Sequence, residues 1–182
     1  MADPAHARMT AAAFLAWSMD RAEADRVELV AGEVVAMAPE RSAHALAKLA
    51  ITRRLADAIE GARLPCTVYP DGMAVMVDDG TVYEPDASVR CGPALPPDAI
   101  VVRDPMIVVE VLSPSTRARD AGAKLEDYFR LPSVRHYLLL KTENRTVILH
   151  TRQPDRTIIT QIVGDGPIRL DPPGIEIAGL FG

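Results

Sequence analysis

Glu110 lies inside the most apolar segment of the chain, which runs from Met106 to Leu112. This segment predicts a central buried strand, in which Val109 and Val111 point to one side and Glu110 to the other. A carboxylate in such a strand must be ion-paired or bound to a metal ion, because an uncompensated buried charge is costly. The alternatives are an edge position where Glu110 faces water, or an ion pair with a purely structural role.

Asp86 follows Pro85 in a second predicted strand, residues 82–90. If the two strands pair, the carboxylates of Asp86 and Glu110 can meet on one face of the sheet. Two carboxylates together with a phosphate and waters are the ligands that Mg²⁺ takes, and such an ion polarises a phosphate and activates water. Taken alone, Asp86 is equally an ordinary acid beside a turn.

Lys124 comes 14 residues after Glu110, on a predicted helix over residues 119–131. It lies at the edge of an apolar stripe on that helix, made of Ala121, Leu125, Tyr128 and Phe129. A lysine there could orient the attacking water or neutralise charge that develops on phosphorus. The simpler alternative is an ion pair with Asp120, four residues earlier on the same helix.

The rest of the pattern predicts the elements that must position these groups. Thr10 can cap a first helix over 11–19, two β-rich runs flank a tight turn at Ala31-Gly32, and Ser42 begins a second helix closed by Gly61. Further strands are predicted over 66–77, 136–141, 146–151 and 157–163. We therefore expect an α/β or α+β fold with a mixed sheet, in one domain over 11–182 that follows a flexible tail over 1–10.

Composition narrows the class of protein. The 182 residues are 48% hydrophobic, which suffices for a core, but no apolar run is long enough to span a bilayer. The first ten residues do not have the pattern of a signal peptide. We expect a cytoplasmic protein that does not bind membranes, in which Cys66 and Cys91 are reduced thiols.

Charge is distributed unevenly along the chain. The net charge is −5, yet residues 115–156 hold 9 Lys and Arg against 5 Asp and Glu, whereas residues 1–110 hold 10 against 17. This pattern suits a site that holds a cation and also meets an anion. Chance scatter over a solvated surface is the alternative.

The chain resembles the Uma-type family of restriction endonucleases, a branch of the PD-(D/E)XK nuclease superfamily, over about residues 29–149. The most specific part runs from Glu110 to Tyr128. The resemblance rests on residues 28–33, His44 after Pro39, Pro85-Asp86, 109–116, Asp120, Lys124, Tyr128, 131–134 and 137–139.

The resemblance implies a restriction-endonuclease-like core, in which helices flank a central mixed sheet, preceded by a helix and a hairpin. Asp86 would match the first metal-holding acid and Glu110 the second. The superfamily's usual lysine, two positions after the second acid, is Leu112 here. In the Uma-type family the lysine lies on the following helix, and Lys124 would match it.

Further positions also match the family. Glu28 could be an extra metal ligand or an acid that supports one, and His44 could contact phosphate or a metal-bound water. For both, an ordinary structural role is the alternative. Ser113, Ser115 and Thr116 could contact phosphate through hydroxyl and N–H groups, or form a plain loop.

The leading hypothesis is therefore an endonuclease that uses Mg²⁺, or Mn²⁺ in its place, to hydrolyse phosphodiester bonds of DNA rather than RNA. The first alternative is a catalytically silent nuclease-fold module that acts in binding, either as a homodimer or as the partner of another protein. A metal-dependent hydrolase of smaller phosphoesters is a third hypothesis, which the basic segment 115–156 disfavours.

Overall fold

The computed structural model describes residues 8–20, 26–112 and 117–181, and of residues 117–121 only the helical backbone. Its elements are α1 (Ala11–Met19), β1 (Val27–Val30), β2 (Glu33–Ala36), α2 (Ser42–Gly61), β3 (Cys66–Pro70), β4 (Val75–Asp78), β5 (Thr81–Tyr83), β6 (Ala87–Cys91), β7 (Ile107–Leu112), α3 (Arg117–Arg130), β8 (His136–Lys141), β9 (Thr146–Arg152), β10 (Ile158–Val163), β11 (Ile168–Leu170) and β12 (Ile175–Ile177).

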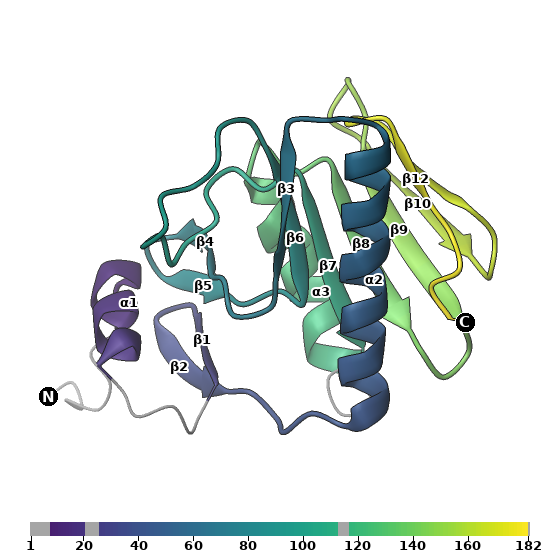
Figure 1. Cartoon of the computed structure of the whole chain (residues 1–182). Helices are drawn as coiled ribbons and strands as arrows, with labels where there is room; N and C mark the ends of the chain where they lie inside the picture. The colour runs from purple at the N-terminus through teal and green to yellow at the C-terminus, as the bar shows by residue number, and fades with distance from the viewer. Residues whose placement is uncertain (1–7, 21–25, 113–116, 182) are drawn as a thin grey trace, which may run out of the picture.

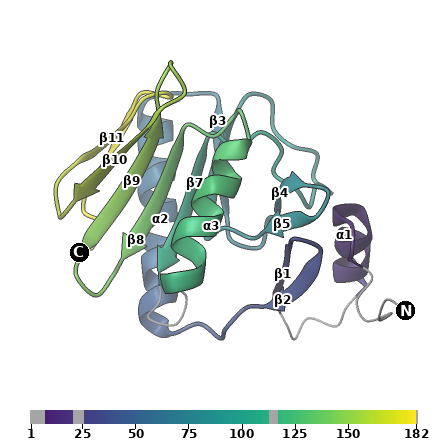
Figure 2. The ribbon, with the colours of Figure 1, turned by 180° about the vertical axis from the view of Figure 1, so that it is seen from behind.

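A six-stranded sheet in the order β10-β9-β8-β7-β6-β3 forms the centre of the molecule. Strands β7 and β8 are parallel and the other neighbours are antiparallel, so the sheet is mixed as expected. Helix α2 covers one face, and α3, which connects β7 to β8, covers the other (Figures 1 and 2). The expectation of a mixed sheet flanked by helices is confirmed.

Strand β7 is buried along its whole length, because both of its faces are covered. Val109 and Val111 pack in the core cluster that contains Ile51 and Leu55 of α2. Val108 and Leu112 belong instead to the cluster of Tyr128 from α3 and several residues of β8 and β4, among them Tyr137, Leu139 and Val75. Glu110 therefore shares its face with Val108 and Leu112, on the side of α3.

A smaller sheet in the order β2-β1-β5-β4 lies beside the large one and packs against α1. The Oγ1 of Thr10 accepts a hydrogen bond from the N–H of Ala13 at 3.2 Å, which confirms the predicted cap of α1. The hairpin β1-β2 turns at Ala31 and Gly32, which have φ of 51° and 85°. A turn with two left-handed residues in succession is typical of tight hairpins, and glycine adopts it without a steric cost.

The structure corrects two predicted strands. Residues 66–77 form β3 and β4 in different sheets, because the chain turns at Asp71-Gly72, where Gly72 has φ of 95°. Residues 82–90 likewise divide into β5 and β6, one in each sheet. The connection between them, residues 84–86, carries the chain from the small sheet to the large one.

Three smaller expectations were also wrong or incomplete. Helix α2 includes Gly61 and ends at the cap residue Ala62, and the left-handed residue that follows is Arg63, with φ of 54°. Cys66 and Cys91, which oppose each other on β3 and β6, form a disulfide instead of two free thiols. Strands β11 and β12 pair with each other and contribute to the core over α2, and the sequence pattern had not indicated them.

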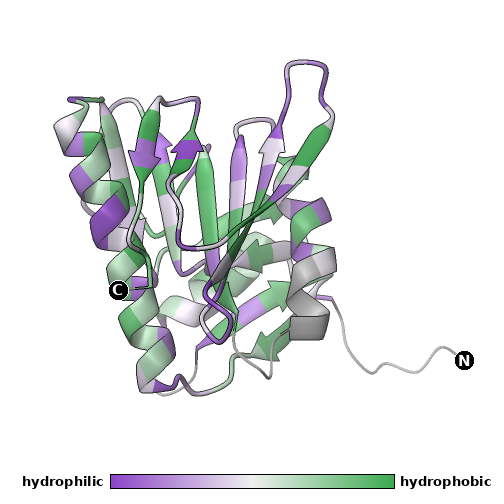
Figure 3. Ribbon diagram, turned by 90° about the vertical axis from the view of Figure 1, so that its right-hand side faces the viewer, coloured by the Kyte–Doolittle hydropathy of each residue, from purple (hydrophilic) through white to green (hydrophobic). Residues whose placement is uncertain are grey.

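Hydropathy follows this architecture. Figure 3 shows green hydrophobic stretches in several strands beside purple hydrophilic ones, and helices that carry residues of both kinds. No helix within the described ranges is both long and apolar enough to cross a membrane.

Candidate active site

Asp86 and Glu110 are brought together where β6 begins and β7 ends. The strands pair with Ala87 opposite Val109, so that Asp86 lies next to this ladder beside Glu110. The backbone N–H of Val111 donates a hydrogen bond to Oδ2 of Asp86 at 2.6 Å. Both side chains are buried, Asp86 with 4% and Glu110 with 7% of its surface exposed. That the carboxylates of Asp86 and Glu110 lie close enough to bind one ion between them stays a prediction.

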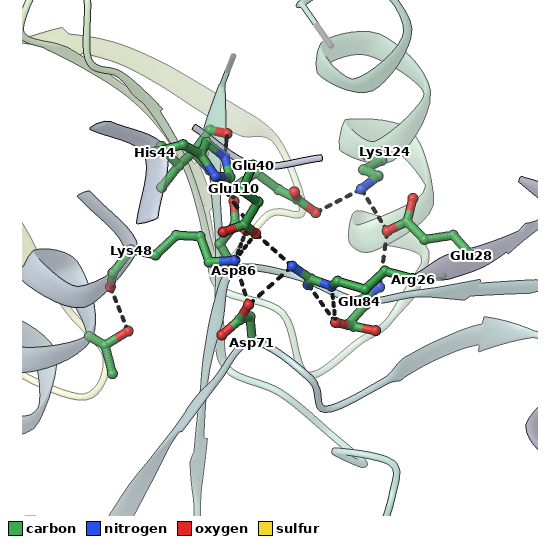
Figure 4. A network of polar contacts seen from close by, with 12 residues as sticks. Arg26, Glu28, Glu40, His44, Lys48, Asp71, Glu84, Asp86, Glu110 and Lys124 are labelled. Atoms are coloured by element: carbon green, nitrogen blue, oxygen red, sulfur yellow. Dashed lines mark hydrogen bonds and ion pairs between the residues drawn. The ribbon is translucent and has the colours of Figure 1, made fainter. Parts of the chain in front are cut away.

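Lys124 reaches Glu110 from α3. Its Nζ lies 3.0 Å from Oε1 of Glu110 and 2.9 Å from Oε1 of Glu28 on β1. The hydroxyl of Tyr128, one helical turn later, donates to the same Oε1 of Glu110 at 2.9 Å. The ammonium also lies 4.9 Å from the centre of the Tyr83 ring. Lys124 thus links an acid of the small sheet to an acid of the large sheet (Figure 4).

The environment of the two acids favours their protonated forms. Burial raises the pKa of Glu110 to about 8, and the charges of Asp86 and Glu28 add to this effect, which Lys124 opposes. Burial also raises the pKa of Asp86, although the N–H of Val111 and the charges of His44 and Lys48 act in the other direction. Perturbed acids of this kind are typical of functional sites, since a bound cation would favour their charged forms.

His44 lies near the start of α2 and faces Asp86. Its Nε2 is 2.6 Å from the carbonyl oxygen of Val111, a contact in which the nitrogen must donate a hydrogen. In neutral histidine, Nδ1 then carries a lone pair. This atom is buried and has no hydrogen-bond partner among the described residues. An imidazole that donates from one nitrogen to a backbone carbonyl and keeps the other one free is arranged as a metal ligand.

A second ionic cluster, which the sequence pattern did not indicate, adjoins Asp86. The ammonium of Lys48, four residues after His44 on α2, contacts Glu40 and Asp71 and lies 3.4 Å from Oδ1 of Asp86. Arg26 joins the cluster through Glu40 at 2.6 Å and Asp71 at 3.2 Å, and its Nε donates to Glu84 at 3.0 Å. The signal that was available is the i, i+4 spacing of His44 and Lys48, which places both on one side of a helix.

The donor set fits a divalent metal ion. Glu40, His44 and Asp86 each offer a ligand atom, and these atoms lie within 4.8 Å of one another. Two carboxylates and an imidazole suit Mn²⁺ and related ions. Of the expected pair of metal ligands, Asp86 belongs to this group, whereas Oε1 of Glu110 accepts hydrogen bonds from Lys124 and Tyr128.

The other residues that the sequence indicated for the site differ in where the structure places them. Glu28 contacts Lys124 and also accepts a hydrogen bond from the N–H of Glu84 at 3.0 Å, so it supports the lysine. Leu112 is buried among apolar side chains, and the ammonium that contacts Glu110 is that of Lys124 on α3. Ser113, Ser115 and Thr116 lie outside the described residues.

Comparison with known proteins identifies the family and supports the fold. Residues 11–178 match the model of the Uma2 family, described as "Putative restriction endonuclease". The chain belongs to the Uma2 family. An uncharacterized Synechocystis protein is 26% identical over 143 residues, which cover 78% of this chain and 73% of that protein. The crystal structure of a "putative nuclease belonging to DUF820" from Anabaena variabilis shares the fold, with a TM-score of 0.67 and 15% identity over 90% of each chain. The Uma2 assignment confirms the resemblance seen in the sequence.

Proposed function

We propose that this Uma2 chain is a metal-dependent endonuclease that hydrolyses phosphodiester bonds of DNA. The observation that carries the proposal is the pair of buried acids, Asp86 and Glu110, at one end of the central sheet with the ammonium of Lys124 at Glu110. The basic segment 115–156 supports a polyanionic substrate over a small phosphoester.

Asp86 and Glu110 would hold the ion, and Glu40 and His44 offer further donors on the other side of Asp86. Bound Mg²⁺ or Mn²⁺ supplies Lewis acidity and lowers the pKa of a coordinated water. The charge of Lys124 would oppose negative charge that develops on the phosphate. Glu28 holds that ammonium in place, and Tyr128 fixes the orientation of the Glu110 carboxylate.

A plasmid-nicking assay with Mg²⁺ or Mn²⁺ tests the proposal. We expect the wild type to nick or cut DNA and Glu110→Gln to abolish cleavage, because the amide keeps the shape of the side chain but lacks its charge. Glu176→Gln, a change of the same type at an exposed position on β12, is the matched control and should leave cleavage unchanged. A folded wild type that neither cleaves DNA nor gains thermal stability from either ion would favour the catalytically silent module.

We also propose that two copies pair through β10, the outermost strand of the large sheet. Its side chains include three exposed isoleucines, Ile158, Ile159 and Ile162, and no charge lies between Arg156 and Asp165. The N–H of Gln153 donates to the carbonyl of Thr157. By alternation, Ile158, Thr160 and Ile162 direct their backbone groups away from β9, where a second strand can bind them.

If β10 pairs antiparallel with β10 of a second copy, the two strands complement each other in charge and in backbone hydrogen bonding. It brings the Arg156 end of one strand to the Asp165 end of the other, while the uncharged middle of the strand opposes itself. A register centred on Thr160 would place Ile158 opposite Ile162 of the second copy. The exposed edge of β10 is therefore suited to bind β10 of a second copy of the chain.

A further inference from the structure

Lys48 is a buried ammonium at a place where the chain gathers ligands for a cation. Only 7% of its side chain is exposed, and its Nζ contacts carboxylates from three separate segments. Glu40 precedes α2, Asp71 follows β3, and Asp86 precedes β6. Three carboxylates stabilise a positive charge in this position strongly enough to offset its desolvation.

The ammonium of Lys48 lies at the group of possible metal ligands described above. Lys48 contacts Glu40 and Asp86, which are two of the three residues in that group, and His44 is the third. The two carboxylate oxygens of Asp86 also have different partners. Its Oδ2 accepts the hydrogen bond from Val111, whereas its Oδ1 faces Lys48 at 3.4 Å. Oδ1, the oxygen of Asp86 that does not accept this hydrogen bond, is therefore the one beside the ammonium.

We propose that Lys48 is a built-in competitor for a divalent cation at Glu40, His44 and Asp86. The ammonium of Lys48 lies beside Oδ1 of Asp86, where it would repel an ion bound to this carboxylate, so the site holds either the ammonium or the ion. Arg26 also contacts Glu40 and Asp71 and is the same in both states. Asp71 gives the lysine a second anchor, because it contacts Nζ and lies outside the metal-ligand group. Lys48 can release Glu40 and Asp86 and keep its contact with Asp71.

This inference deepens the proposed function, since it concerns the ion on which cleavage would depend, but it is tested by binding rather than by activity. We expect Lys48→Met to bind Mn²⁺ about tenfold more tightly or better than the wild type, because the variant removes a like charge from the site. The measurement is a calorimetric titration of the full chain with MnCl₂ at fixed ionic strength. Arg53→Met, which removes a positive charge from the exposed side of α2, is the control and should leave the affinity near that of the wild type.

Two further variants make the test specific. Asp71→Asn takes away the second anchor, so Lys48 should hold Glu40 and Asp86 more firmly and Mn²⁺ should bind more weakly than to the wild type. Lys48→Met combined with Glu40→Gln should lose the gain in affinity, because one metal ligand is then missing. Lys48→Gln, which also lacks the charge, keeps the test decisive if Lys48→Met does not fold, and it should show the same gain in affinity.

The outcomes separate this inference from the nuclease proposal. If Lys48→Met folds and binds Mn²⁺ no more tightly than the wild type, the competition is refuted, whether or not the wild type cleaves DNA. If the wild type does not cleave but Lys48→Met gains affinity and Asp71→Asn loses it, the competition stands without the nuclease. In a Glu110→Gln background Mn²⁺ should bind more weakly overall, because Glu110 would also hold the ion, but Lys48→Met should still raise the affinity, because Lys48 contacts Glu40 and Asp86.

Discussion

Glu110 is an acid that prefers its proton in the folded protein. Burial, with the charges of Asp86 and Glu28, raises its pKa from the ordinary value of 4.5 to about 8, although Lys124 opposes the shift. In the unfolded chain the side chain loses its proton near its ordinary pKa, so between these two values the folded state holds more protons than the unfolded state. The contribution of Glu110 to stability must therefore fall as the pH rises from about 4.5 to about 8.

Glu110→Gln should remove this pH dependence. We expect the difference in melting temperature between variant and wild type, both without metal, to shift in favour of the variant as the pH rises through that range. Below and above it, the difference should be flat. Melting curves over a pH series check this, and a difference that shifts in favour of the wild type would show that the charge of Glu110 is paired too well to be a free metal ligand.

Lys124→Met should lower both stability and cleavage. The substitution removes the ammonium that lies between Glu28 and Glu110 and leaves two buried acids without their shared cation. Breaking a buried ion pair from one side costs about 3 kcal/mol or more in unfolding free energy. Urea unfolding measures this, with Arg53→Met as the control on an exposed surface. A loss below about 0.5 kcal/mol, as for most surface changes, would contradict the buried bridge.

At the level of elements, the disulfide ties strand β3 at the edge of the large sheet to its neighbour β6. The two cysteines are 25 residues apart, so the bond restricts a long loop in the unfolded chain. Replacing both by serine should lower the unfolding free energy by about 3 kcal/mol. Denaturant unfolding with and without a reductant checks this, since the reductant should destabilise the wild type and leave the double variant unchanged. A wild type that is insensitive to reductant would contradict the bond.

The elements themselves could largely be predicted, because their patterns are local. The run 106–112 predicted β7, the Thr10 cap predicted α1, and Ala31-Gly32 predicted the first hairpin. The sequence did not reveal where β3 ends and β4 begins, because both are apolar and a sheet change depends on distant partners. The turn at Asp71-Gly72 was the local signal for that break.

The site could be predicted in part for the same reason. Glu110 was visible because an acid in an apolar strand is unusual, and the family resemblance indicated Asp86 and Lys124. Lys48 and Asp71 were not visible, because a lysine on a helix and an aspartate in a turn are ordinary residues until the fold joins them. Contacts between separate segments carry no local pattern.

At the scale of the whole molecule, the proposed pairing through β10 predicts a dimer of the 19.7 kDa chain. Ile162→Lys should weaken this dimer by about tenfold or more, because it buries a charge where an isoleucine packed. Sedimentation equilibrium measures the effect. Leu46→Lys changes a residue on α2 that is 65% exposed, compared with 76% for Ile162, and should leave the dimer intact.

The register of the pairing can be checked separately. Thr160 would oppose its own copy, so Thr160→Cys should form a disulfide-linked dimer under oxidising conditions, whereas Gln161→Cys should do so only if the strands pair one step away from this register. A wild type that sediments as a monomer at every concentration would refute the pairing through β10.

The ion pair between Lys124 and Glu28 joins residues far apart in sequence, and this affects when the site can form during synthesis. Lys124 and Glu28 are 96 residues apart in sequence, and β7 is fixed in the sheet by β8, which follows α3. Closing so long a loop is entropically costly, and contacts of large sequence separation slow folding. Because β7 pairs with β8, we expect a nascent chain to assemble Glu28, Glu110 and Lys124 only after residues through Lys141 have left the ribosome.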